Sequence, residues 1–269
     1  ASTLVLLFYI AKIIIHPSAV KAEYSNTVPA SLYAGITMVT MILCSYYKVW
    51  FPTACKWIFI TAVCVHAVHI LVFLCRNVFK GVNLDTFVPS WFVTFNGIMV
   101  SLVAGPDMLP SAMAKAVLYW GLFIYTVTIP FMVWRLITRE VKPGMLHTQA
   151  IVLAPCSLCL VSYLNIVKEP VRAVVMILYV CVILSLLFIL VKLPRFFSVP
   201  FAPGFAGLTF PMAIGVVAST KAGSYLAGIG NEVLAYGVKQ VAGIQIYVTT
   251  AIIGMVLFGF MKMLAGKKA

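Results

Sequence analysis

The sequence predicts an all-α integral membrane protein, because of its composition and the length of its apolar runs. Hydrophobic residues make up 63% of the 269 residues and charged residues 9%. A soluble domain averages roughly 25% charged residues, so this chain has too few charges to cover a water-facing surface. Apolar runs of about 20 residues, the length that crosses ~30 Å of hydrocarbon, recur throughout. We expect one transmembrane domain over residues 1–269 with nine spans, at 1–15, 30–47, 54–75, 88–105, 112–134, 146–164, 171–191, 202–220 and 241–261.

After the first span, the spans alternate between two kinds. The outer kind is long, uniformly apolar and rich in Leu, Val and Ile, and is found at 54–75, 112–134, 171–191 and 241–261. The inner kind is shorter and carries Pro, Gly, Ser, Thr or Asn, and is found at 30–47, 88–105, 146–164 and 202–220. An interior proline costs an ordinary helix about 3 kcal/mol or more. Irregular backbone at membrane depth is tolerated where it lines a cavity or is buried in protein. We therefore expect the inner spans to surround a central path.

The four inner spans also align with one another. Pro29, Pro89, His147 and Pro203 are register points separated by 60, 58 and 56 residues. The residues seven and eight positions further on are predicted to line the path or to kink the helix, and they are Ile36, Thr37, Asn96, Gly97, Ala154, Pro155, Phe210 and Pro211. This pattern indicates a repeat of two-helix units. Span 1–15 is then the second half of a unit whose first helix precedes residue 1, which gives five hairpins.

The basic residues predict the orientation of the spans. Twelve of the 19 Lys and Arg residues lie on the side where the outer spans end, among them Arg76, Arg135, Lys192 and Lys262. The positive-inside rule makes this side cytoplasmic. We expect a multi-pass protein of the plasma (cell inner) membrane with a cytoplasmic C-terminus. The net charge of +13 therefore reflects topology and anionic lipid headgroups, and no nucleic-acid partner is expected.

The inner spans contain no Asp, Glu, Lys or Arg. This absence argues against a proton-driven carrier that uses an intramembrane carboxylate, and against a cation filter built from acidic rings. A neutral path with basic mouths favours anions. The same charge distribution also arises simply because a bilayer excludes charges from spans, and composition does not choose between these two interpretations.

Few residues are candidates for metal binding or catalysis. His66 and His69 have the i, i+3 spacing of a shared metal site, but no third ligand is in view and we expect no metal. Cys156 and Cys159 lie inside an apolar span and are interpreted as core packing. Glu23 precedes an inner span, where we expect a capping role and, as a second interpretation, a gate contact. No nucleophile–base pair, phosphate loop or cofactor motif is present, so we expect neither enzyme activity nor a cofactor.

Four segments together resemble the TehA / slow anion channel family, also called the tellurite-resistance/dicarboxylate transporter family, which includes the yeast malate permease. The resemblance covers essentially the whole chain. Its pieces are specific in combination and weak singly, and they lie at 16–33, 88–101, 147–164 and 202–219, the last containing Thr209-Phe210-Pro211.

This resemblance implies ten helices arranged as five hairpins with quasi-fivefold symmetry, an anion pore through the inner helices, and a homotrimer with one pore per subunit. It also implies that a phenylalanine on the ninth helix plugs the pore, a role that transfers to Phe210, with Thr209 beside it. The expected function is that of a membrane anion channel or facilitative transporter for small inorganic or organic anions. A coupled exporter of dicarboxylate or sulfite is the alternative within transport. A membrane enzyme or a structural membrane subunit is the alternative outside it.

Overall fold

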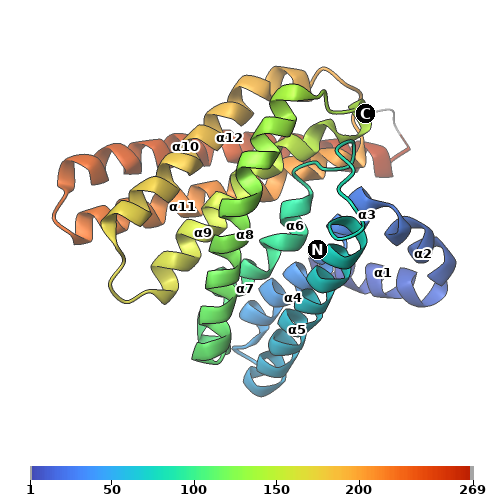
Figure 1. The fold of residues 1–269 in the computed structure, drawn as a ribbon, viewed down its shortest axis with the longest axis horizontal. Coiled ribbons are helices and arrows are strands. Elements are labelled where there is room, and N and C mark those ends of the chain that lie inside the picture. The colour runs from blue at the N-terminus through green and yellow to red at the C-terminus, as the bar shows by residue number, and fades with distance from the viewer. Residues whose placement is uncertain (1, 267–269) are drawn as a thin grey trace. The chain divides into compact units, whose positions relative to one another are not determined.

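The chain is mainly helical in the part that a computed structural model describes, residues 2–266, and these residues contain no strand (Figure 1). The predicted all-α class is therefore confirmed. The chain packs as two compact units, unit 1 over residues 1–139 and unit 2 over residues 140–269. The single domain expected over residues 1–269 stays a prediction. Residues 1 and 267–269, which begin the first expected span and form the C-terminus, lie outside the described residues.

Unit 1 contains two long helices and a series of short ones. The long helices are α5 (Pro52–Asn77) and α8 (Ser111–Thr138), of 26 and 28 residues. Pro52 is the first residue of α5. Proline is well tolerated there, because the backbone N–H that it lacks would have no hydrogen-bond partner within the helix. The other elements are α1 (Ser2–Ile15), α2 (Pro17–Ser25), α3 (Thr27–Leu32), α4 (Ala34–Tyr47), α6 (Trp91–Phe95), η1 (Gly97–Met99), α7 (Val100–Ala104) and η2 (Pro106–Met108).

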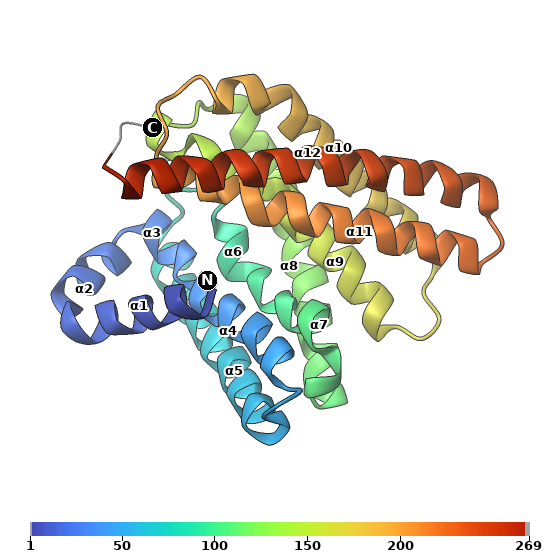
Figure 2. The ribbon, with the colours of Figure 1, turned by 180° about the vertical axis from the view of Figure 1, so that it is seen from behind.

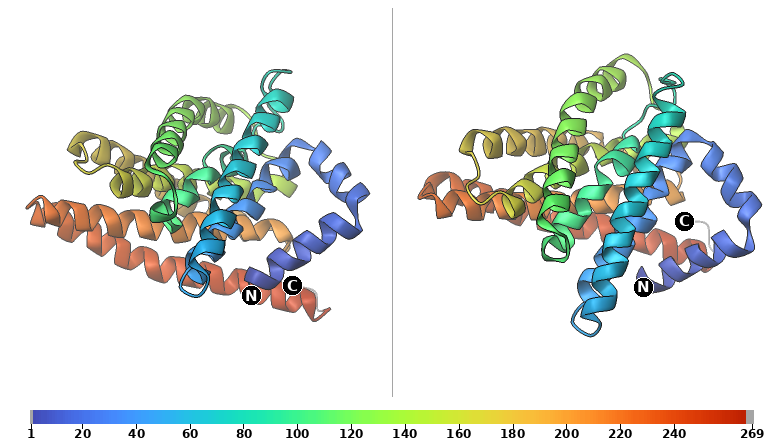
Figure 3. Two further views of the ribbon diagram at one scale, coloured as in Figure 1. Left: turned by 90° about the horizontal axis from the view of Figure 1, so that it is seen from below. Right: turned by 60° about the horizontal axis from the view of Figure 1, so that its bottom comes forward.

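The chain between α5 and α8 runs back along unit 1. Both long helices begin at the same end of the unit, as Figures 1 and 3 show, so α6, η1 and α7 return between them. This returning segment is the expected span 88–105, and it consists of three short helices rather than one. Gly97 allows η1 to approach its neighbours closely, because a Cβ there would lie 2.8 Å from Met38 Sδ and 3.0 Å from His66 Cε1.

Unit 2 is built around α9 (Leu153–Ile166), whose residues from Leu153 to Tyr163 are all buried. Helices α10 (Arg172–Phe196) and α11 (Thr209–Gly228) pack on α9, and α12 (Glu232–Leu264) lies along α11 (Figure 2). The Asn231 side chain caps α12 by accepting a hydrogen bond from the Leu234 N–H. The remaining elements are the 3-10 helices η3 (Pro143–Val152) and η4 (Pro203–Leu208).

Among residues 2–266, seven helices are long and apolar enough to span a membrane, at 27–47, 52–77, 111–138, 143–166, 172–196, 203–228 and 232–264. These match seven of the nine expected spans. α1 has 14 residues and covers about 21 Å, less than the ~30 Å of hydrocarbon. It forms a bent pair with α2, at 100°, which raises the count to eight if the pair is one span. Nine spans and the quasi-fivefold arrangement stay predictions.

Each inner span is interrupted, so that its last α-helix begins only after a break or a 3-10 segment. α4 follows a break at Tyr33, and α7, α9 and α11 follow η1, η3 and η4. The outer helices α5, α8, α10 and α12 have no such interruption. Pro155 and Pro211 were expected in the middle of a span, where a proline would kink the helix, but the structure has them near helix starts. Each is the third residue of its α-helix, where the backbone N–H has no partner within the helix and proline is tolerated.

Candidate functional site

Phe210 is the second residue of α11, and Thr209 separates it from the end of η4 at Leu208. The Thr209 hydroxyl donates a hydrogen bond to the Ala206 carbonyl (2.8 Å), which ties the start of α11 to the 3-10 segment. The neighbouring Leu208 and Met212 are 0% and 1% exposed, whereas Phe210 is half-buried. A bulky ring is thus fixed at a helix start without being enclosed in the core.

The 3-10 segment before Phe210 is held in place by His147 of η3. The His147 Nε2–H donates to the carbonyl of Phe196 at the end of α10 (3.0 Å). The His147 ring centroid lies 3.9 Å from that of Phe205 in η4. His147 therefore connects η3, α10 and η4, and positions the backbone that leads into Phe210.

The other expected path-lining or kink residues fall into two groups. Ile36, Thr37 and Thr209 are half-buried, and the buried group is Asn96, Gly97, Ala154, Pro155 and Pro211. The Asn96 amide Nδ2 donates to the Gly121 carbonyl of α8 (3.0 Å), so this side chain joins an interrupted segment to an outer helix. Ile36 lines a pocket of about 170 Å³ between α1 and α4.

The role of His66 and His69 was missed from the sequence. The His66 Nε2–H donates to the Thr94 carbonyl (2.9 Å), and its Nδ1 lies 2.7 Å from the Thr37 hydroxyl. His69 Nδ1 lies 2.7 Å from the Tyr24 hydroxyl, and its Nε2 lies 3.2 Å from Thr94 Oγ1. All four ring nitrogens therefore bind protein groups. In the described part of the chain, no cluster of three or more His, Cys, Asp or Glu side chains is arranged to hold a metal.

These imidazoles belong to a polar network inside unit 1. The Thr94 hydroxyl donates to the Ser31 carbonyl (3.0 Å), and the Ser31 hydroxyl donates to Ser90 Oγ (2.8 Å). The network joins α5 to the interrupted segments α3–α4 and α6 through hydroxyl, imidazole and carbonyl groups. The spacing of two histidines on an apolar helix, opposite spans that carry Ser and Thr, is the sequence signal that points to it.

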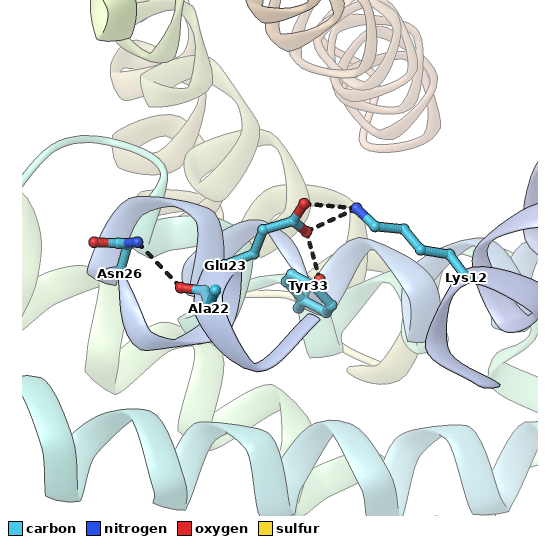
Figure 4. Close-up of polar contacts among 5 residues, drawn as sticks. All are labelled: Lys12, Ala22, Glu23, Asn26 and Tyr33. Carbon is cyan, nitrogen blue, oxygen red and sulfur yellow. Dashed lines mark hydrogen bonds and ion pairs between the residues drawn. The ribbon is translucent and has the colours of Figure 1, made fainter. Parts of the chain in front are cut away.

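A half-buried ion pair lies where α1 bends into α2 (Figure 4). Lys12 Nζ lies 2.7 and 2.8 Å from the two Glu23 carboxylate oxygens, and the Tyr33 hydroxyl donates to Glu23 Oε2 (2.7 Å). Tyr33 is the residue at the break between α3 and α4. The expected capping role of Glu23 is therefore not what the structure shows: Glu23 connects the bend to an interrupted inner segment, and Asn26 occupies the N-cap position of α3.

A family model matches almost the whole chain. The model of the SLAC1 family, described as a voltage-dependent anion channel, matches residues 1–264. A comparison with curated proteins found no match. The matched residues include unit 1, unit 2 up to residue 264, the Phe210 segment and the polar network around His66.

Proposed function

The chain belongs to the SLAC1 family of voltage-dependent anion channels, and from this premise we propose that it forms a TehA-type anion pore gated by Phe210. The observation that carries this proposal is the half-buried Phe210 ring at the junction of η4 and α11. Because a rigid helix start holds the ring while its surface stays partly uncovered, the ring is suited to closing a path.

The chemistry of the inner spans supports an anion as the permeant species. These spans carry no Asp, Glu, Lys or Arg, and the chain has a net charge of +13. A neutral path with basic ends concentrates anions without binding them to a fixed cation. The polar network around His66 and His69 in unit 1 consists of hydroxyls, carbonyls and the ring nitrogens of these two imidazoles, without a carboxylate. Chloride, nitrate, sulfite or a dicarboxylate such as malate all fit this description, and the proposal includes neither a cofactor nor a catalytic step.

The proposed assembly follows the family resemblance. Helical hairpins surround the pore in a quasi-fivefold bundle that forms one transmembrane channel domain, and three subunits form a homotrimer surrounded by membrane lipids. Alternation of interrupted inner helices with continuous outer helices supports the bundle. The protein lies in the plasma membrane with its C-terminus in the cytoplasm, and the excess of Lys and Arg at the ends of the outer helices supports this orientation.

Single-cysteine labelling is expected to place residues 80 and 110 on opposite sides of the membrane. Lys80 follows α5 and Pro110 precedes α8, and both are exposed. The interrupted segment α6–η1–α7 lies between them, so it has to cross the bilayer if the nine-span count is right. The measurement uses a membrane-impermeant maleimide and a background in which the native cysteines are replaced. Labelling of both positions from the same side would show that this segment enters and leaves on one face.

Anion flux is expected to follow the anion gradient and to change little between pH 6 and 8. The inner spans hold no carboxylate that must load and release a proton, and such groups usually mark proton-coupled transport. The measurement is anion uptake by proteoliposomes with and without an imposed proton gradient. Uptake that requires the proton gradient would favour the coupled exporter of dicarboxylate or sulfite instead.

A further inference from the structure

The C-terminal end of α12 forms one side of a pocket of about 310 Å³ in unit 2. The segment between α10 and η4, together with Phe205 of η4, forms the other side. Phe197, Phe201 and Phe205 line the pocket from this segment, and Met255, Phe258 and Lys262 line it from α12. Its volume is at the small end of the range of about 300–1,000 Å³ that is typical of ligand pockets.

The lining residues of α12 are ordered by polarity along the helix. Met255, Phe258 and Lys262 are spaced i, i+3 and i+7, so they share one face and extend about 10 Å along the axis. Lys262 lies in the last turn of an apolar helix that is long enough to span a membrane. In a membrane-spanning α12, Met255 lies deeper in the hydrocarbon than Lys262, and Lys262 lies near the headgroups. An amphiphile in a bilayer has this same order of tail and charge.

The charge of Lys262 is available to a ligand. Its Nζ lies 5.0 Å from the centroid of the Phe258 ring, and it forms no ion pair with any residue that the structure describes. The aromatic side opposite is held by packing within that segment and against α12. The Phe201 centroid lies 4.9 Å from that of Phe205 and 5.2 Å from that of Phe260.

We propose that this pocket binds one anionic membrane phospholipid from the leaflet at the C-terminal end of α12. The phosphate pairs with Lys262, and the start of an acyl chain lies along Phe258 and Met255. The lining combines apolar and aromatic side chains with a single cation, which fits an anionic headgroup joined to an apolar tail. This inference depends on the membrane placement of α12 and not on any role of Phe210.

The pocket lies next to η4, so a bound lipid is also expected to affect the gate. This second inference rests on the proposed function. Phe205 of the pocket packs against the His147 ring and lies in η4, which ends two positions before Phe210. A bound lipid therefore packs against the same 3-10 helix that positions the proposed gate. Bound lipid is expected to restrict the movement of η4.

Native mass spectrometry of the purified protein titrated with phosphatidylglycerol or phosphatidylcholine tests the site. The unmodified protein and Lys262→Arg are expected to retain one phosphatidylglycerol in preference to phosphatidylcholine. Lys262→Gln is expected to weaken phosphatidylglycerol binding at least about fivefold, the effect of one lysine near an anionic headgroup. Lys192→Gln is the matched control: Lys192 Nζ lies 5.9 Å from the Phe188 ring, but this pair does not line the pocket.

Three outcomes would overturn the proposal. The first is equal binding of phosphatidylglycerol and phosphatidylcholine. The second is an equal loss of phosphatidylglycerol binding in Lys262→Gln and Lys192→Gln. The third is a change of subunit number in Lys262→Gln, which would show that a second copy of the chain covers this surface. Lipid binding is measured without ion flux. A protein that binds the lipid but conducts no anions would therefore contradict the proposed function alone.

Discussion

Replacing Phe210 with alanine is expected to raise the anion current about tenfold or more, since lowering a barrier by about 1.4 kcal/mol already gives a tenfold faster rate. A ring across a narrow path blocks hydrated anions and forms an apolar constriction that excludes water. The ring is half-buried, so its removal is expected to leave the protein folded. The measurement is single-channel current in a planar bilayer, together with the thermal stability and oligomeric state of the variant.

Phe59→Ala is the matched control for the loss of an aromatic ring. Phe59 lies in α5 and is 0% exposed. Truncating a buried phenylalanine typically costs about 3–5 kcal/mol of stability, so this variant is expected to unfold at a lower temperature with no gain in current. Well-folded Phe210→Ala protein with the currents of the parent would show that Phe210 is not a gate.

Replacing His66 with alanine is expected to destabilise the protein by about 2–4 kcal/mol, from an unpaired carbonyl and a cavity together. The His66 side chain is 0% exposed. Its loss removes the hydrogen bond to the Thr94 carbonyl and the contact with the Thr37 hydroxyl. Both partners belong to interrupted inner segments, so the loss is expected to loosen α4 and α6 together. The measurement is the thermal unfolding midpoint in detergent.

His16→Ala provides the comparison for His66→Ala. His16 is exposed at the bend between α1 and α2, and surface substitutions usually change stability by no more than about 0.5 kcal/mol. If His66→Ala unfolds at the same temperature as His16→Ala, the polar network contributes nothing measurable to stability.

The membrane class and most of the spans are predictable from the sequence because they depend on apolar run length alone. Span 54–75 corresponds to α5 and span 112–134 to α8, and α8 continues as one helix through Pro130. Span 1–15 is not long enough to cross a membrane by itself, because Pro17 starts a new helix that turns away from α1. Span 88–105 is not one continuous helix, because α6 ends before Asn96 and the chain from Gly97 forms the 3-10 helix η1.

The interruptions of the inner spans are only partly predictable. Pro155 and Pro211 indicate where the helical hydrogen bonding is weak, but a proline pattern does not tell whether the residue kinks a helix or begins one. The structure has both prolines in the first turn of an α-helix. The contacts of Glu23 with Lys12 and Tyr33 depend on the bend at Pro17, and a pattern of charges along the chain contains no information about that bend.

The central claim is that this chain is an anion-conducting pore, and the most direct test is the reversal potential of the purified protein in a planar bilayer with asymmetric potassium chloride. The current of the unmodified protein is expected to reverse near the Nernst potential of chloride. The current of Phe210→Ala is expected to be larger and to reverse at the same potential. Reversal near the potassium potential, or transport without any unitary current in either protein, would contradict the account.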